Sequence, residues 1–272
     1  MREITDVETP FGEPVEEVPL PEAPLIVVVA QIRFPPIASI AKQEFIGSFQ
    51  EQIRESYPVL RQEREVNVVV TPEGIDPAGD STPVWRFLDR PEGTEWTVSL
   101  SSSFVSLDTR RYTSRADFLD RLRRVLDALS STIGPSTVDR VGLRYVDRVD
   151  LNEATDTLAA LVRSEVLGMS TVTPGGTAEL IHSLADAEFK LHDASLRGRW
   201  GCLPAKAQLD RLHGDPVDTP SWILDLDMYS STVGEFDVER LAQTAEQFAE
   251  RIYRFFRWAV QPEFLRRYGG AI

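Results

Sequence analysis

The chain has 272 residues, of which 42% are hydrophobic and 26% are charged, as in an ordinary globular protein. Its net charge of -14 argues against broad nucleic-acid binding, which needs a basic surface. The single cysteine, Cys202, excludes an intrachain disulfide and a cysteine-based metal site. The first residues lack the apolar core of a signal peptide, and no apolar run is long enough to cross a membrane. We therefore expect a cytoplasmic protein.

The N-terminal segment, residues 1–23, is acidic and rich in proline. Such a composition buries too little apolar surface to offset the entropy lost on ordering. We expect a mobile or loosely docked arm. A solvated tail is favoured over an arm that reaches a partner.

The next segment, residues 24–135, is expected to form the first half of the fold, which begins with a strand and ends with a helix. Leu25 to Phe34 is a strand, almost wholly apolar up to Ala30 and therefore central. A helix is expected at 40–57, with Phe45, Ile46, Phe49, Ile53 and Tyr57 on one stripe. Strands are expected at 65–71, 84–89, 95–101 and 104–109, with Pro91-Glu92-Gly93 as a turn. Ser114, with Asp117 three residues later, predicts the start of a second helix that ends before Gly134.

The second half, residues 136–272, opens with the strand 140–149, in which side chains alternate. Val141, Leu143, Tyr145 and Val149 face one way, and Arg140, Arg144 and Arg148 face the other. A helix follows at 155–167, then a β region at 178–200 with a hairpin around Ala185-Asp186. Trp222, Leu224, Leu226 and Met228 predict the buried face of a later strand, which turns Asp225 and Asp227 away. Asp237 is expected to cap a final amphipathic helix.

The two halves repeat the same order of elements, and Trp96 to Leu129 parallels Trp222 to Phe256. We therefore expect an α+β fold made of two tandem β-α-β(3–4)-α halves. Their order is similar to that of TATA-binding-protein-like folds and of helix-grip folds. Either arrangement forms a curved antiparallel sheet backed by long helices.

The strand Arg140-Val141-Gly142-Leu143-Arg144-Tyr145-Val146-Asp147-Arg148 resembles a family hallmark, R-[IV]-G-L-R-Y-[IV]-N-R-I. This hallmark is typical of a sporadically distributed family of uncharacterised bacterial proteins of about this length. The segment from Pro24 to Pro35, Trp85-Arg86-Phe87 and the stretch 107–112 are similar to that family as well. Asp147 departs from the pattern, since the family usually has Asn there. The resemblance implies no reaction.

The arginine row is the candidate binding site. If one face of the sheet is open, Arg140, Arg144 and Arg148 lie along it with Gln31 and Arg33 from the first strand, and Arg86, Thr97 and Ser99 share it. Arginine forks suit carboxylate, phosphate or a protein partner. The more favoured interpretation is cross-strand pairing with Asp225, Asp227 and Asp147, which neutralises the row internally. The alternation also suits a self-complementary dimer face.

No motif indicates catalysis or a resident cofactor, so we name no catalytic residue. His182 and His192, expected on adjoining strands with Asp186 or Asp193 nearby, match no ligand spacing, and a metal site is disfavoured. A nuclease-like role for Asp225 and Asp227 is also disfavoured. Interleaved aspartates partly cancel the basic cluster of Arg110, Arg111, Arg115, Arg121, Arg123 and Arg124. Surplus aromatics of the last helix, Tyr253 and Phe256, are expected to contact the other half or a second subunit.

The expected function is therefore that of a non-enzymatic protein-interaction module of a bacterial accessory system, working through the arginine-lined face. The alternatives are an anion, nucleotide or nucleic-acid binder on the same face, and a helix-grip carrier of an apolar ligand. A protein partner or a homodimer is expected, and nucleic acid and membrane are not.

Overall fold

The computed structural model describes residues 7–65, 69–71, 74–76, 82–151, 156–207 and 215–271. They form two compact units. Unit 1 comprises Met1–Val28, Leu143–Ser230 and Glu246–Ile272, and unit 2 comprises Val29–Gly142 and Ser231–Ala245. The boundaries fall inside three elements, namely β1 (Leu25–Arg33), β9 (Arg140–Asp150) and α5 (Val238–Ala259).

The main sheet has nine strands in the order β10-β11-β12-β9-β1-β7-β6-β5-β2. Besides β1 and β9, these are β2 (Val59–Glu65), β5 (Thr82–Leu88), β6 (Trp96–Ser101), β7 (Phe104–Thr109), β10 (Ser183–Lys190), β11 (Ser195–Leu203) and β12 (Ser221–Ser230). With several helices, this confirms the predicted α+β class with a large antiparallel sheet. The apolar β1 is the middle strand of the order, as expected.

The direction of the central strands follows from hydrogen bonds at their ends. The N–H of Asp139 donates to the carbonyl of Arg33 at 2.8 Å, and that of Arg148 donates to Pro24 at 2.8 Å. The start of β9 thus lies beside the end of β1, and its end beside the start, so the pair is antiparallel. The register of β10–β11, β11–β12, β2–β5, β5–β6 and β6–β7 is also antiparallel.

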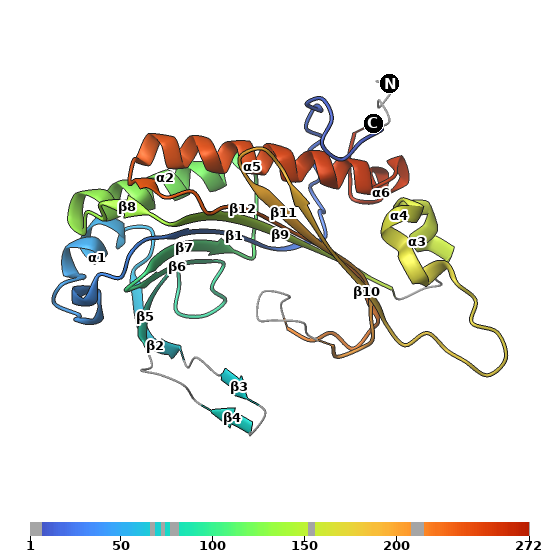
Figure 1. Cartoon of the computed structure of the whole chain (residues 1–272), viewed down its shortest axis with the longest axis horizontal. Coiled ribbons are helices and arrows are strands. Elements are labelled where there is room, and N and C mark those ends of the chain that lie inside the picture. Colours follow the sequence, from blue (N-terminus) through green and yellow to red (C-terminus); the bar gives the residue numbers. More distant parts are fainter. Residues whose placement is uncertain are drawn as a thin grey trace. The chain divides into compact units, whose positions relative to one another are not determined.

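Unit 2 builds its core between the strands β5 to β7 and two helices, α1 (Gly47–Ile53) and α2 (Arg115–Thr132) (Figure 1). The rings of Phe49 on α1 and Phe87 on β5 are 5.4 Å apart, and those of Trp96 and Phe118 are 5.9 Å apart. The predicted cap of α2 is present, since Ser114 Oγ accepts from the N–H of Asp117 at 3.1 Å. Short elements complete the unit: η1 (Ala38–Ala41), β3 (Val69–Thr71), β4 (Gly74–Asp76), β8 (Thr137–Val138) and β13 (Gly234–Glu235).

In unit 1 the C-terminal part of α5 packs on β10 and β11 through aromatic side chains. Phe255 lies 6.0 Å from Trp200 and 5.7 Å from Phe189, measured between ring centroids. The predicted stripe of Phe248, Ile252, Phe255 and Ala259 is buried. The other helices of this unit are α3 (Asp156–Leu161), α4 (Ser164–Leu167), η2 (Gly168–Thr171) and α6 (Pro262–Arg267).

Several predicted boundaries are wrong. The helix expected at 40–57 is split into η1 and the short α1, and Phe45 is 39% exposed. The strand expected at 65–71 corresponds in part to β3, while the polar strand β2 was missed; residues 66–68 lie outside the described part of the chain. The helix expected at 155–167 is interrupted because Val162 bridges to Val260.

The β10–β11 hairpin turns at residues 191–194, where the N–H of Leu191 donates to the carbonyl of Ala194 at 2.8 Å. The expected turn at Ala185-Asp186 is wrong, because these residues lie within β10. His192-Asp193 provides the polar residues that a tight turn favours. The matching of Trp96 with Trp222 also fails in detail, since β7 follows β6 before α2, whereas β12 is the last strand of the main sheet before α5.

The N-terminal arm is docked, which corrects the expectation of a solvated tail. The N–H of Val18 donates to Tyr253 Oη at 2.7 Å, and Arg254 Nη1 donates to the carbonyl of Gly12 at 3.0 Å. The surplus aromatics of α5 have partners within the chain: Tyr253 contacts the arm, and the ring of Phe256 lies edge-to-face with Phe264 of α6 at 5.6 Å. Among the described residues, no helix has the length and apolar character needed to span a membrane.

Candidate functional site

The candidate site is a charged sheet face in unit 1, formed by alternate residues of four strands. The antiparallel register places Arg199 of β11 opposite Asp225 of β12, and Arg197 opposite Asp227. On the other side of β11, Asp186 and Glu188 of β10 lie opposite Arg199 and Arg197. Acidic and basic positions therefore alternate across β10, β11 and β12, and β9 adds Arg144 and Arg148.

Asp225 is the centre of this face. Its Oδ1 accepts from Arg144 Nε at 2.7 Å and its Oδ2 from Arg144 Nη2 at 2.8 Å. Arg199 approaches from the other side, with Nη2 2.6 Å and Nε 3.0 Å from Oδ2. The Asp225 side chain is 1% exposed, and those of Arg144 and Arg199 are 15% and 20% exposed. One buried carboxylate thus fixes two guanidinium groups in place.

The outer part of the face is open to solvent, and we call it the charged rim: Asp186, Glu188, Arg197 and Tyr229. Arg197 Nε donates to Asp186 Oδ1 at 2.9 Å, and Tyr229 Oη donates to Glu188. The side chains of Arg197 and Asp186 are 50% and 45% exposed. The hydrogen bond from Arg197 lowers the pKa of Asp186, so this carboxyl is charged at neutral pH.

The predicted site residues divide between the two units. Arg144, Arg148, Asp225 and Asp227 belong to unit 1, and Gln31, Arg33 and Arg140 to unit 2. Arg148 Nη1 donates to the carbonyl of Asp215 at 3.0 Å, and its Nε lies 3.6 Å from Asp150. Arg144 pairs with Asp225, as the favoured interpretation of the arginine row expected. Val146, on the same face by alternation, is fully buried, so this part of the face is not open.

Asp147 does not pair with the row, contrary to expectation, because alternation places it on the opposite face with Leu143 and Val149. It is 7% exposed, and burial raises its pKa to about 7. Near neutral pH the carboxyl is therefore largely uncharged.

Unit 2 has a smaller polar group on its own strands. Arg86 Nε lies 2.6 Å from Glu63 Oε2, and Arg86 Nη1 donates to Ser99 Oγ at 3.2 Å. Thr97 lies two residues from Ser99 on the same face, as predicted for these residues. Burial raises the pKa of Asp108 to about 6, and the charges of Arg86 and Arg110 oppose that rise.

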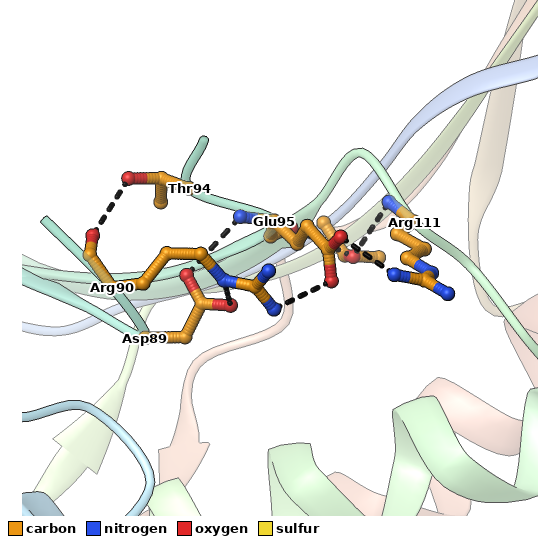
Figure 2. Close-up of polar contacts among 6 residues, drawn as sticks. Asp89, Arg90, Thr94, Glu95 and Arg111 are labelled. Atoms are coloured by element: carbon orange, nitrogen blue, oxygen red, sulfur yellow. Dashed lines mark hydrogen bonds and ion pairs between the residues drawn. The ribbon is translucent and has the colours of Figure 1, made fainter. Parts of the chain in front are cut away.

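A second cluster of charges joins the β5–β6 turn to the end of β7 (Figure 2). Glu95 accepts from Arg90 at 2.9 Å and from Arg111 at 2.8 Å, while its N–H donates to Asp89 Oδ1 at 3.1 Å. The carboxylates of Asp89 and Glu95 have partners within this cluster. Gly93, in the β5–β6 turn, has a φ of +62°. We assign the cluster a structural role in closing the turn.

The basic cluster of α2 is paired as predicted. Arg121 lies 3.1 Å from Asp117, and Arg124 lies 2.6 Å from Asp120, each four residues apart on the helix. Arg111 and Arg123 pair with Glu95 and Glu239. These arginines form a solvated surface on which they pair with carboxylates of the same chain.

His182 precedes β10 and His192 follows it, so they lie at opposite ends of an eight-residue strand rather than side by side. Asp193 pairs with Arg251 at 2.7 Å. Within the described residues, no cluster of three or more His, Cys, Asp or Glu could hold a metal ion. His213 lies outside them.

The sequence did not single out Arg197, Arg199, Asp186 and Glu188 as parts of the unit 1 face. The sequence does contain a relevant pattern, because Arg197 and Arg199 are separated by one residue, as are Asp225 and Asp227. Only the register of β11 against β12 makes the two pairs opposite. Comparison of the chain with protein-family models, with curated proteins and with solved structures gives no match.

Proposed function

We propose that this protein is a non-enzymatic interaction module that binds a protein partner through the charged rim of unit 1. The observation that carries the proposal is the contrast within one face. Arg144 and Arg199 are fixed on the buried Asp225, whereas Arg197 and Asp186 remain about half exposed. A prearranged, exposed set of charges on a rigid support favours specific docking.

The balance of charges favours a protein over a polyanion. In unit 1, the face of β9 to β12 carries equal numbers of both signs: Arg144, Arg148, Lys190, Arg197 and Arg199 against Asp150, Asp186, Glu188, Asp225 and Asp227. A phosphate would have to displace Asp225 from Arg144 and Arg199. A partner surface with its own mixed charges can match the rim without that cost.

The position of β10 supports the same proposal. It is the last strand in the sheet order, so its outer edge makes no pairing in the part of the sheet that the structure describes. Edge strands can accept a strand from a partner. On β10 the exposed residues include Leu184, Asp186 and Glu188, so an added strand would lie beside the charged rim.

We further infer that the chain is a tandem duplication of the TATA-binding-protein-like kind, related to the bacterial family that its β9 motif resembles. The sheet order supports this, because β9 is flanked by β12 and β1 by β7, each the last sheet strand before a long helix. The helix-grip carrier has less support. In unit 1, rings of α5 contact rings of β10 and β11 directly, where a carried ligand would lie. A cytoplasmic bacterial accessory system is the proposed setting.

The test is a pull-down of the tagged protein with products of neighbouring genes, followed by mass measurement of the assembly. Arg197→Glu should lower the affinity for the captured partner at least tenfold. Arg266→Glu is the matched control, because Arg266 is 58% exposed and also pairs with a carboxylate, Glu263, on α6. Equal affinity of both folded variants for the partner would refute the rim as the interface. A second copy captured in place of another protein would identify a homodimer.

A further inference from the structure

Main-chain groups of the N-terminal arm form hydrogen bonds with the rest of unit 1. Arg254 donates to the carbonyl of Gly12 at 3.0 Å, Arg257 to that of Glu16 at 3.4 Å, and Arg163 to that of Val7 at 2.9 Å. With the 2.7 Å bond from Val18 N–H to Tyr253, the contacts extend over residues 7–18. Figure 1 draws this blue segment beside α6 and the end of α5. Recognition of backbone groups along a segment is the way proteins hold extended peptides.

One aromatic side chain of the arm, the half-buried Phe11, contacts rings of the unit 1 core. The ring of Phe11 lies 5.4 Å from Phe189 of β10 and 5.9 Å from Phe255 of α5. Within residues 7–18, Val7, Pro10, Gly12, Val15 and Val18 are also half-buried, while Glu8, Glu13, Glu16 and Glu17 are exposed. The arm therefore presents one aromatic anchor and a series of acidic side chains.

The surface under the arm retains unused hydrogen-bonding capacity. In the described structure, Nε of Arg254 and Nε of Arg257 are buried and have no acceptor. Arg257 is 7% exposed, although its Nη1 reaches the arm. A buried donor without an acceptor costs free energy. A segment with oxygens close to these two atoms would therefore make hydrogen bonds that the arm does not make.

We propose that this surface is a peptide-binding site, formed by Arg163, Tyr253, Arg254 and Arg257 beside the rings of Phe189 and Phe255. Its ligand is an extended, acidic segment of a partner protein with one aromatic side chain. The arm occupies the site within the same chain and is displaced by that ligand. This site is separate from the charged rim, so either proposal can fail without the other.

The arm can be made exchangeable in the full chain by placing a protease site within residues 19–21. After cleavage, a fluorescent peptide of residues 7–18 is added and its binding followed by anisotropy. We expect saturable binding to the cut protein and at least tenfold weaker binding to the uncut one. An unrelated acidic peptide with phenylalanine at the matching position should compete. The same peptide with lysine in place of each acidic residue, or with alanine in place of phenylalanine, should not.

The variants Arg254→Ala and Arg251→Ala form a matched pair on α5, since Arg251 pairs with Asp193 and not with the arm. Arg254→Ala should weaken peptide binding at least tenfold, and Arg251→Ala should not change it. The proposal is overturned if the cut protein keeps its circular dichroism but binds no peptide. It is also overturned if only the native arm sequence competes, or if both arginine variants bind equally.

Discussion

Asp147 is a carboxyl group buried within a β-strand, and its protonation contributes to stability. Its pKa is raised by burial from 3.8 to about 7 in the folded protein. The folded state therefore holds a proton that the unfolded chain releases above pH 4. This contribution is fully present below the unfolded pKa and is lost as pH rises through 7, by up to about 4 kcal/mol.

Replacing Asp147 with Asn removes the ionisation. We expect Asp147→Asn to raise the free energy of unfolding at pH 8 by roughly 2 to 4 kcal/mol and to change it little at pH 4. Urea unfolding at the two pH values measures the difference. Asp150→Asn, an exposed carboxylate on the same strand, is the control. If Asp147→Asn changes the free energy of unfolding equally at both pH values, the buried carboxyl is not the titrating group.

Asp225 holds two arginines, so its removal leaves both without their acceptor. We expect Asp225→Ala to lower the free energy of unfolding by about 3 to 5 kcal/mol, because a buried ion pair loses one partner. Asp186→Ala removes the half-exposed acceptor of Arg197 and should cost about 1 kcal/mol or less. Chemical denaturation of both variants decides the matter. Similar losses would mean that Asp225 is no more important than a surface carboxylate.

The same residues show why the rim is the better place to test function. A charge reversal at Arg144 or Arg199 places a second carboxylate beside the buried Asp225 and would disturb the fold. The charge at Arg197 can be reversed with less effect on stability, because its side chain is half exposed and solvent screens the new charge. Loss of partner binding by Arg197→Glu can therefore be separated from loss of folding.

At the scale of elements, Gly201 allows the end of β11 to lie close to the start of β10. Its φ is +146°, and a Cβ there would lie 1.9 Å from the carbonyl oxygen of Ser183. We expect Gly201→Ala to lower the free energy of unfolding by more than about 3 kcal/mol, because the backbone must move. Thermal unfolding by circular dichroism measures the loss.

Gly47→Ala is the control for Gly201. At the start of α1, a Cβ on Gly47 would meet no atom within 4 Å. Alanine favours a helix over glycine by about 1 kcal/mol or less, so this variant should be unchanged or slightly stabilised. A stable Gly201→Ala protein would show that the two strands can separate at that point without cost.

Elements with long periodic patterns could be predicted from the sequence. The strands β1, β9 and β12 and the helices α2 and α5 follow the alternation or the stripe expected of them, and Ser114 and Asp237 cap their helices. The edge strand β2 was missed, because a strand at the margin of a sheet can be polar on both faces. The turn at His192-Asp193 was misplaced, because Ala185-Asp186 presents a similar local signal.

The site was only partly predictable, because it depends on contacts between distant residues. Arg144 and Asp225 are 81 positions apart, and their pairing requires the β9–β12 neighbourhood. The docked arm was not predictable from its composition. It is held by arginines on α5 that bind carbonyl oxygens, and every residue carries such an oxygen.

For the molecule as a whole, the charge distribution excludes most polyanionic partners. Acidic residues number 43 against 29 lysines and arginines. Seven arginines of α2 and of β9 to β11 pair with carboxylates: Arg121, Arg123, Arg124, Arg144, Arg148, Arg197 and Arg199. Nucleic-acid binding derives most of its free energy from cations that neutralise phosphates and release counterions. A phosphate contact with any of these seven arginines would first require breaking an internal ion pair.

We therefore expect no saturable binding of a fluorescent 20-base-pair duplex or a 20-nucleotide single strand at 150 mM salt. Weak binding at 20 mM salt should disappear steeply as salt rises, as for non-specific contacts. Fluorescence anisotropy with the full-length protein measures both. Submicromolar binding that is abolished by Arg197→Glu but retained by Arg266→Glu would assign the charged rim to nucleic acid and replace the protein partner proposed here.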